Sequence, residues 1–167
     1  VDETYPYFLS GGFWMSYRGI EINRNLDTLY SATINDMKNI QLNNKCGVAK
    51  NILPKMLSII KNDSLINQID SLWINKLRQW DYSYDANSIV TTFFDTWIKK
   101  VEELTWFDDF GKEDSLYIWP NINVLDELGN QKPNSKWFDD KLTENTESFN
   151  DIVVKSFNLT LKYLNDV

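Results

Sequence analysis

Residues 86–104 read ANSIVTTFFDTWIKKVEEL, with apolar side chains at steps of three and four. The apolar positions are Ile89, Val90, Phe93, Phe94, Trp97, Ile98, Val101 and Leu104. On a helix with about 3.6 residues per turn, these positions form one broad stripe. The stretch therefore predicts a helix with a wide buried face.

The same periodicity extends outward from this helix in both directions. Four further helices are predicted at residues 33–42, 47–61, 64–80 and 146–165. Thr33 and Asp36 form a loose capping box at the start of the first of these helices. Ser64 is interpreted as an N-cap, because its hydroxyl can accept from the first free N–H groups of a helix. Pro54 is expected to kink or split the helix in which it lies.

Between residues 105 and 143 the helical signal fails, because Gly111, Pro120, Gly129 and Pro133 interrupt the pattern. We expect a long irregular excursion there, with one or two short helical turns. No stretch of convincing length alternates as a strand does. The sequence thus predicts an all-α fold, an irregular orthogonal helical domain of about five to seven helices, forming a single domain over residues 1–167.

The composition excludes several classes of chemistry. The chain has no histidine and one cysteine, Cys46, so it holds neither an imidazole base nor a zinc finger of ordinary type. With 17 basic and 24 acidic residues, its formal charge of −7 has the wrong sign for a nucleic-acid partner. No apolar run is long enough for a membrane span, and no basic-then-apolar pattern opens these residues, so neither a span nor a signal peptide is expected within them. Because the first residue is Val1, we expect a processed chain or a piece of a longer one.

Carboxylates are the groups available for acid–base chemistry. The paired candidates are Asp108 with Asp109, Asp139 with Asp140, and Asp81 with Asp85. A functional pair would need one carboxyl group with a raised pKa beside an ionised partner. Neighbouring acids more often cap helices or face solvent, so we favour a structural role. A glycosidase that uses two carboxylates has no support in the sequence.

Other motifs also have structural interpretations. Residues 108–114 are acidic and contain a glycine but lack the alternating oxygens of a calcium loop, so no metal site is predicted. The tetrapeptide WFDD occurs at 106–109 and again at 137–140, but the flanks differ, so we interpret the echo as coincidence. The seven tryptophans could stack on a ring-bearing ligand, but most are expected in the core. Cys46 is assigned no role.

Arg18 is the one basic residue in an unusual setting, because it follows the glycine-containing aromatic stretch GGFWMSY at 11–17. A guanidinium among aromatic rings can present a rigid fork of donors to a carboxylate or carbonyl. The alternative is a helix-start arginine that pairs with Glu21 or faces solvent. From the residues alone, the alternative is favoured.

Several motifs together, in their order along the chain, resemble those of the penicillin acylases, also called penicillin amidases. They are YPY at 5–7, WMSYRGIEI at 14–22, TINDMKNIQL at 33–42, ILP at 52–54, LRQWD at 77–81, SIVTTFFDTW at 88–97 and WFDDKLT at 137–143. The resemblance runs the whole chain. It implies a family of N-terminal nucleophile hydrolases, in which a serine at the start of the β subunit attacks an amide and its own amine replaces histidine.

The resemblance places these 167 residues in the mainly helical middle of the acylase β subunit. The expected partners are the rest of the parent acylase, its α subunit and β-subunit sandwich, and a small-molecule amide substrate. Faces of the helices at 16–26 and 146–165 are expected to pack against the missing sandwich. Because the nucleophile and the oxyanion asparagine of the family lie outside it, the segment alone is expected to be inactive. A periplasmic or extracellular location is favoured by the resemblance.

One functional residue carries over from the family. Arg18 stands at the position of an active-site arginine that orients the surroundings of the nucleophile and the oxyanion asparagine, and Tyr17 beside it fits that motif. A calcium-ligating aspartate found in some members is not matched, because residues 7–10 read YFLS. No cofactor is therefore expected in this chain, and the resemblance leaves calcium possible in the parent enzyme. Glu21 also replaces a usual arginine. The alternative function is a non-catalytic acidic helical interaction module.

Overall fold

The computed structural model describes residue 6 and residues 17–61, 68–111 and 118–165. The regular elements in these ranges are α1 (Tyr17–Leu26), α2 (Ile34–Leu42), α3 (Gly47–Lys61), α4 (Gln68–Gln79), α5 (Ile89–Phe110), α6 (Ile122–Gln131), a 3-10 helix η1 (Lys136–Phe138) and α7 (Phe149–Asn165). Within the described ranges, β-structure is limited to one isolated antiparallel bridge between Lys45 and Ser83. The all-α prediction is confirmed.

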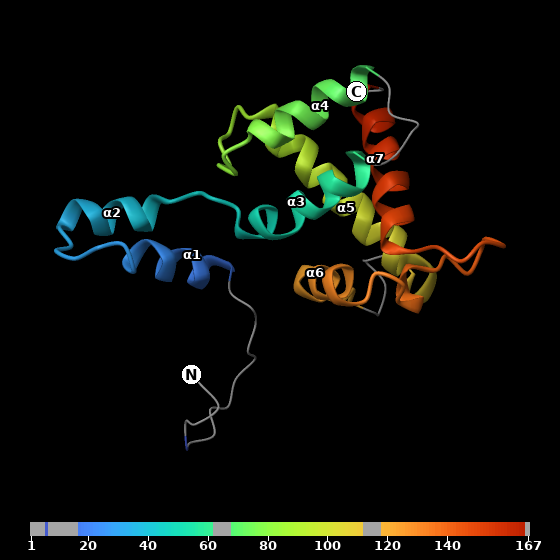
Figure 1. Ribbon diagram of the computed structural model, residues 1–167, viewed down its shortest axis with the longest axis horizontal. Helices are drawn as coiled ribbons and strands as arrows, with labels where there is room; N and C mark the ends of the chain where they lie inside the picture. The colour runs from blue at the N-terminus through green and yellow to red at the C-terminus, as the bar shows by residue number, and fades with distance from the viewer. Residues whose placement is uncertain (1–5, 7–16, 62–67, 112–117, 166–167) are drawn as a thin grey trace.

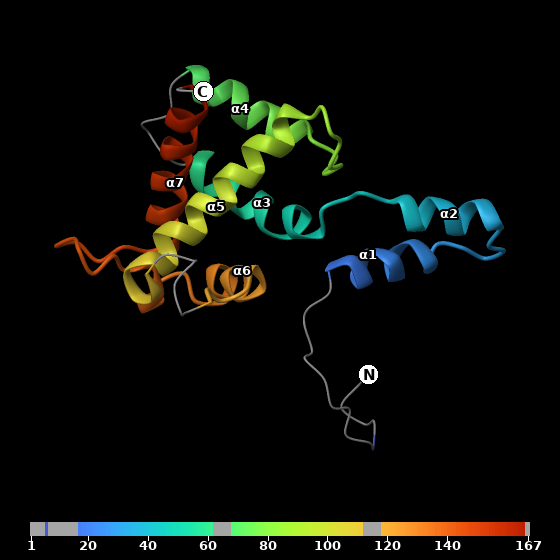
Figure 2. The same ribbon diagram turned by 180° about the vertical axis from the view of Figure 1, so that it is seen from behind.

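Helix α5 runs through the middle of the helical body formed by α3–α7, and it packs most extensively against α7 (Figures 1 and 2). Phe93 and Trp97 of the predicted stripe contact Phe157 of α7, whereas Ile89 at the start of the stripe is exposed. Trp97 is fully buried, its ring lies 4.9 Å from that of Phe157, and its indole Nε1–H donates to Ser156 Oγ at 3.0 Å. Burial of such large rings supplies most of the driving force for folding.

Helices α1 and α2 extend away from this body (Figures 1 and 2). We call residues 17–42 the helical arm. Helix α2 has no buried residue, and its start carries the predicted capping box of Thr33 and Asp36. The large apolar side chains exposed on the arm are Ile20, Leu26, Tyr30, Ile34, Met37 and Leu42. The arm is therefore held by few contacts and leaves much apolar surface uncovered.

The helices predicted at 33–42, 47–61, 86–104 and 146–165 correspond to α2, α3, α5 and α7. Pro54 was expected to kink or split its helix, and it does not split it, because α3 is continuous from Gly47 to Lys61. Pro54 lacks only one backbone donor, and its neighbours Leu53 and Met56 are buried in the core, which compensates for the loss. Ser64, predicted as an N-cap, lies outside the described residues.

The irregular excursion predicted for residues 105–143 is shorter than expected. Helix α5 continues to Phe110 because Thr105 and Trp106 extend its buried face, and it ends at Gly111, whose φ is 74°. Helix α6 occupies ten residues in which only short turns were expected. Gly129 does not break α6, because the missing side chain makes room for the Phe149 ring: a Cβ there would lie 2.8 Å from Phe149 Cζ.

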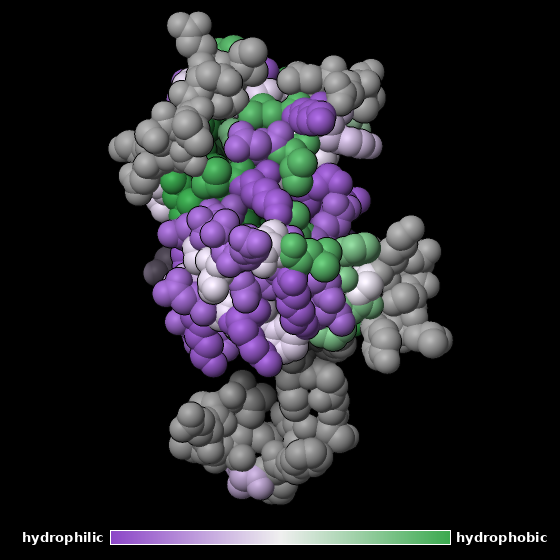
Figure 3. All heavy atoms as spheres, turned by 90° about the vertical axis from the view of Figure 1, so that its right-hand side faces the viewer, coloured by the Kyte–Doolittle hydropathy of each residue, from purple (hydrophilic) through white to green (hydrophobic). Residues whose placement is uncertain are grey.

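No helix in the described part of the chain is both long enough and apolar enough to cross a membrane. On the face shown in Figure 3, hydrophilic residues predominate over the middle of the molecule, and hydrophobic residues gather in a smaller region above them.

Candidate functional site

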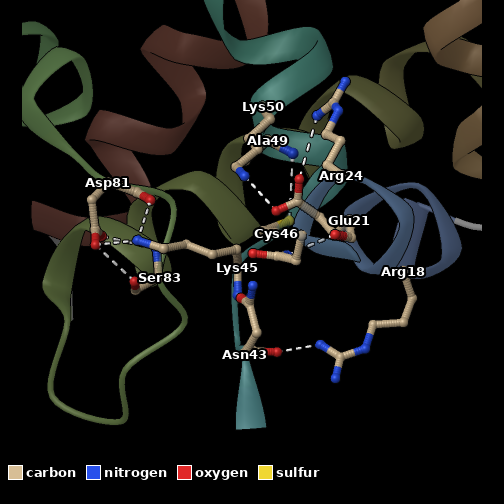
Figure 4. Close-up of polar contacts among 11 residues, drawn as sticks. Arg18, Glu21, Arg24, Asn43, Lys45, Cys46, Ala49, Lys50, Asp81 and Ser83 are labelled. Atoms are coloured by element: carbon tan, nitrogen blue, oxygen red, sulfur yellow. Dashed lines mark hydrogen bonds and ion pairs between the residues drawn. The ribbon is translucent and has the colours of Figure 1, made fainter. Parts of the chain in front are cut away.

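Arg18 lies in the first turn of α1, and its exposed guanidinium reaches the end of α2 (Figure 4). It donates to the main-chain oxygens of Gln41 at 2.8 Å, of Ile40 at 3.3 Å and of Asn43. These carbonyls belong to the last turn of α2 and its C-cap, where the helix dipole favours a positive charge. Arg18 therefore joins the two helices of the arm. The expected pairing with Glu21 is not among its hydrogen bonds.

Tyr17, one residue earlier, points to the helical body instead. Its hydroxyl donates to Asp126 Oδ2 in α6 at 2.7 Å. Burial and the hydrogen bond to Asp126 raise the pKa of Tyr17, so the phenol stays protonated and keeps donating. Asp126 is 4% exposed and also accepts from Asn51 Nδ2 in α3 and from Asn130 Nδ2 at 2.7 Å. One carboxylate thus connects α1, α3 and α6.

Glu21, one turn beyond Tyr17, forms the second polar link between α1 and α3. It is 5% exposed, pairs with Lys50 of α3, and accepts from Arg24 at 3.3 Å (Figure 4). The hydrogen bond from Lys50 holds the pKa of Glu21 below its ordinary value, against the opposing effect of burial. A cavity of about 290 Å³ lies beside this pair, lined by Tyr17, Ile20, Glu21, Arg24, Gly47, Lys50 and Asn51.

The segment that leads from α2 into α3 is fixed by the turn after α4. Lys45 pairs with Asp81, and Asp81 Oδ2 also accepts from Ser83 Oγ at 2.8 Å (Figure 4). Asn44 Nδ2 donates to Asp85 Oδ1 at 3.0 Å. The hydrogen bond from Lys45 lowers the pKa of Asp81, so this carboxylate is ionised at neutral pH. Asp81 and Asp85 therefore bind separate partners and show no sign of an acid–base pair.

The other two acid pairs also have structural partners. Lys141 pairs with Asp109, which raises the Lys141 pKa, and its main-chain N–H donates to Asp108 Oδ2 at 3.1 Å. Asp139 Oδ1 accepts the main-chain N–H of Glu147 at 3.2 Å, and Asp140 Oδ2 lies 3.5 Å from Lys155 Nζ. The structure places these pairs and the helical arm on opposite sides of the molecule (Figures 1 and 2).

The two WFDD copies contact each other in space, although their local structures differ. Trp106 in α5 meets Trp137 in η1 edge to face, with ring centroids 6.1 Å apart. A cavity of about 480 Å³ lies beside them, lined by Glu103, Leu104, Phe107, Asp108, Trp119, Asp140 and Leu142. One copy is helical and the other is a 3-10 turn, which agrees with the interpretation that they are not a structural repeat.

Nothing in the described ranges groups three metal-binding side chains at a site that could hold an ion. Residues 112–114 of the acidic stretch 108–114, which was weighed as a calcium loop, fall outside these ranges. Cys46 is a free, half-buried thiol whose Sγ accepts the main-chain N–H of Ala49 at 3.4 Å. Of the tryptophans, Trp80, Trp97 and Trp106 lie in the core. Trp14 lies outside the described residues.

Sequence reasoning missed Asp126, Asn51 and Glu21 as members of the arm's attachment. Asp126 was missed because it lies in the stretch where glycine and proline argued against a helix. If a helix had been predicted from Ile122 onward, Asp126 would have shared a face with Leu125 and Gly129, which are buried positions. An acid at such a position must have donors, which is a usable signal.

The sequence model of the family described as penicillin amidase matches the chain over residues 1–167. No curated protein matches the chain.

Proposed function

Because this chain belongs to the penicillin amidase family over residues 1–167, we propose that it is a helical part of an enzyme that hydrolyses the amide bond of a small linear substrate. The products are a carboxylic acid and an amine. The observation that carries the proposal is the family match over the whole chain.

The proposed mechanism places the nucleophile and the oxyanion asparagine in a part of the enzyme outside these 167 residues. In the family, both precede the stretch that Tyr17 and Arg18 match. An N-terminal serine attacks the amide carbon, its own amine takes up the proton, and an oxyanion hole stabilises the negative charge of the tetrahedral intermediate. This chemistry requires neither histidine nor a cofactor, which is consistent with a chain that contains no histidine.

Arg18 is the residue of this chain that we assign to the active site, where it orients the oxyanion asparagine and the surroundings of the nucleophile. Support comes from its position in the family motif and from its exposure at the start of α1. Its acceptors in this structure are main-chain carbonyls and not a carboxylate. An arginine held in this way offers directed donors to a neighbouring oxygen.

We assign the helical arm a second role, which is to pack against the remaining parts of the acylase, its α subunit and the β-subunit sandwich. The support is the apolar surface of the arm: Tyr30 is 98% exposed, and Ile34 and Leu42 are each 78% exposed. Large apolar side chains gathered on one short segment mark a contact surface rather than a solvated face. A non-catalytic interaction module would also use such a surface, and activity separates the two functions.

The test is hydrolysis of a phenylacetyl anilide by the full-length enzyme. Arg18→Ala is expected to lower kcat/KM by about a hundredfold, the loss typical of a group that supports an oxyanion hole. Arg24→Ala is the matched control, because Arg24 lies in the same helix, and it should stay within about threefold of the wild type. The isolated 167 residues should show no hydrolysis. Hydrolysis by the isolated chain that survives Arg18→Ala would refute the assignment, and a full-length protein without amidase activity would favour the interaction module.

A further inference from the structure

Asp126 is a buried carboxylate that accepts hydrogen bonds from three helices. Tyr17 Oη and Asn51 Nδ2 donate to its Oδ2, and Asn130 Nδ2 donates to its Oδ1. The donors come from α1, α3 and α6 itself, and the residue is 4% exposed. Hydrogen bonds depend on angle as well as distance, so the carboxylate fixes both the positions and the orientations of its donor side chains.

The charge of Asp126 is compensated locally. Lys55 of α3 interacts electrostatically with Asp126, and its Nζ donates to the main-chain oxygen of Gly129. Burial lowers the pKa of Lys55, and the charge of Asp126 opposes that effect. A buried charge with several donors and a nearby cation is stable only in one arrangement, because each lost partner leaves a desolvated group.

Helix α1 depends on such polar contacts for its position on the body. Its main neighbour there is α3, and the two backbones approach closely at Gly47, where a Cβ would lie 2.6 Å from Tyr17 Cβ. The interface next to this contact is a cavity of about 290 Å³ rather than packed apolar side chains. Apolar packing alone therefore does not determine how α1 lies.

We propose that Asp126 is a positioning residue for Arg18. Through Tyr17 it holds the first turn of α1 against α3 and α6, and Arg18 is the next residue of that turn. The carboxylate fixes the point from which the guanidinium leaves the helix. This inference rests on the proposed function, since it concerns catalysis only if Arg18 acts at the active site.

The test compares two variants that remove the same chemical group. Tyr17→Phe removes the hydroxyl that bonds to Asp126, whereas Tyr84→Phe removes a hydroxyl that donates to Asp95 at 2.5 Å. In the full-length enzyme, Tyr17→Phe is expected to lower kcat about tenfold with KM within twofold, because small displacements of a catalytic group are costly. Tyr84→Phe should leave both constants within twofold. Equal effects of the two variants would overturn the proposal.

Two further measurements separate positioning from simple loss of stability. In an Arg18→Ala background, Tyr17→Phe should lower kcat less than twofold further, because there is no guanidinium left to position. Asp126→Asn should reproduce the loss seen with Tyr17→Phe, and the two changes combined should cost little more than either one. Additive losses would contradict the inference.

Amide hydrogen exchange in α1 tests the inference without reference to activity. Tyr17→Phe should speed exchange at residues 17–26 at least about fivefold relative to Tyr84→Phe. If the full-length protein hydrolyses no amide, the proposed function fails, while faster exchange in α1 would still support the anchoring by Asp126. Unchanged exchange would refute the anchoring even in an active enzyme.

Discussion

The guanidinium of Arg18 donates a 2.8 Å hydrogen bond to the main-chain oxygen of Gln41, in the last turn of α2. Together with the bonds to Ile40 and Asn43, this contact makes one side chain of α1 the C-terminal cap of α2. The proposed active-site arginine therefore also holds the arm together. A change at Arg18 must be expected to affect both functions.

Arg18→Ala should loosen the end of α2 without unfolding the protein. Because α2 buries no residue, loss of its cap should lower the free energy of unfolding by less than about 1 kcal/mol. Amide hydrogen exchange over residues 34–43 should accelerate, while exchange in α5 stays unchanged. Arg18→Lys keeps the charge but not the fork of donors, so its exchange rate over residues 34–43 should lie between those of the wild type and Arg18→Ala. Unaltered exchange in α2 would show that these hydrogen bonds do not hold the helix end.

Glu21→Gln should weaken the attachment of α1 to α3 and remove the pH dependence that the Glu21–Lys50 pair gives to this attachment. The substitution keeps the shape of the side chain but leaves Lys50 without its anion. Since Lys50 is partly exposed, we expect a loss of about 1–2 kcal/mol in the free energy of unfolding, below the range for fully buried pairs. Arg24, at the edge of the pair, contributes less because its side chain is 63% exposed.

The same pair gives a defined pH dependence. Lys50 lowers the pKa of Glu21 in the folded protein below the ordinary value of 4.5. The stabilisation is therefore complete above about pH 4.5 and is lost as the pH falls through the lower folded value. Denaturant titrations of wild type and Glu21→Gln should differ at pH 7, and the difference should shrink as the pH falls below 4.5. A difference that does not change with pH would rule out this linkage.

Gly47→Ala should push α1 away from α3. The new Cβ would lie 2.6 Å from Tyr17 Cβ and 3.2 Å from the Tyr17 main-chain oxygen, so the backbones must separate. We expect a loss of about 1–3 kcal/mol in stability and faster amide exchange in α1. Gly129→Ala is the control, because it creates a similar clash with the Phe149 ring in the core. If both variants speed exchange in α1 equally, Gly47 has no special part in seating that helix.

Apolar periodicity predicted the helices that build the core. It succeeded because the buried side chains of each helix lie on one face, which repeats at the helical period. The inner face of α5 holds the predicted stripe from Phe93 onward, whereas Ile89 at its start is exposed, and the capping box at Thr33 marks the start of α2 as expected. Prediction failed at α6, where Gly129 looks like a helix breaker but accommodates the Phe149 ring. That role depends on a side chain from another helix, so no local pattern reveals it.

The candidate site was less predictable than the fold, because its contacts join distant parts of the chain. Tyr17 and Asp126 are 109 positions apart, and nothing near either residue indicates the other. Arg18 was singled out by its aromatic neighbours and by the family motif, but its acceptors are main-chain carbonyls, which carry no sequence signal. The paired acids were conspicuous in sequence and proved to bind nearby lysines and main-chain N–H groups.

Trp97→Phe should be among the most destabilising single changes in the body. The indole is fully buried between α5 and α7, and its Nε1–H donates to Ser156 Oγ at 3.0 Å and to the Val153 oxygen at 3.3 Å. Phenylalanine leaves a void and a Ser156 hydroxyl that has lost its donor, so the free energy of unfolding should fall by about 2–4 kcal/mol.

Trp119→Phe is the matched control. Its indole also donates a hydrogen bond, to the main-chain oxygen of Gly111 at 2.9 Å, but the side chain is half-buried. Its loss should stay near 1 kcal/mol, since a well-solvated site leaves a smaller void. Equal losses in denaturant titrations of the two variants would mean that the contact between α5 and α7 is not the centre of the core.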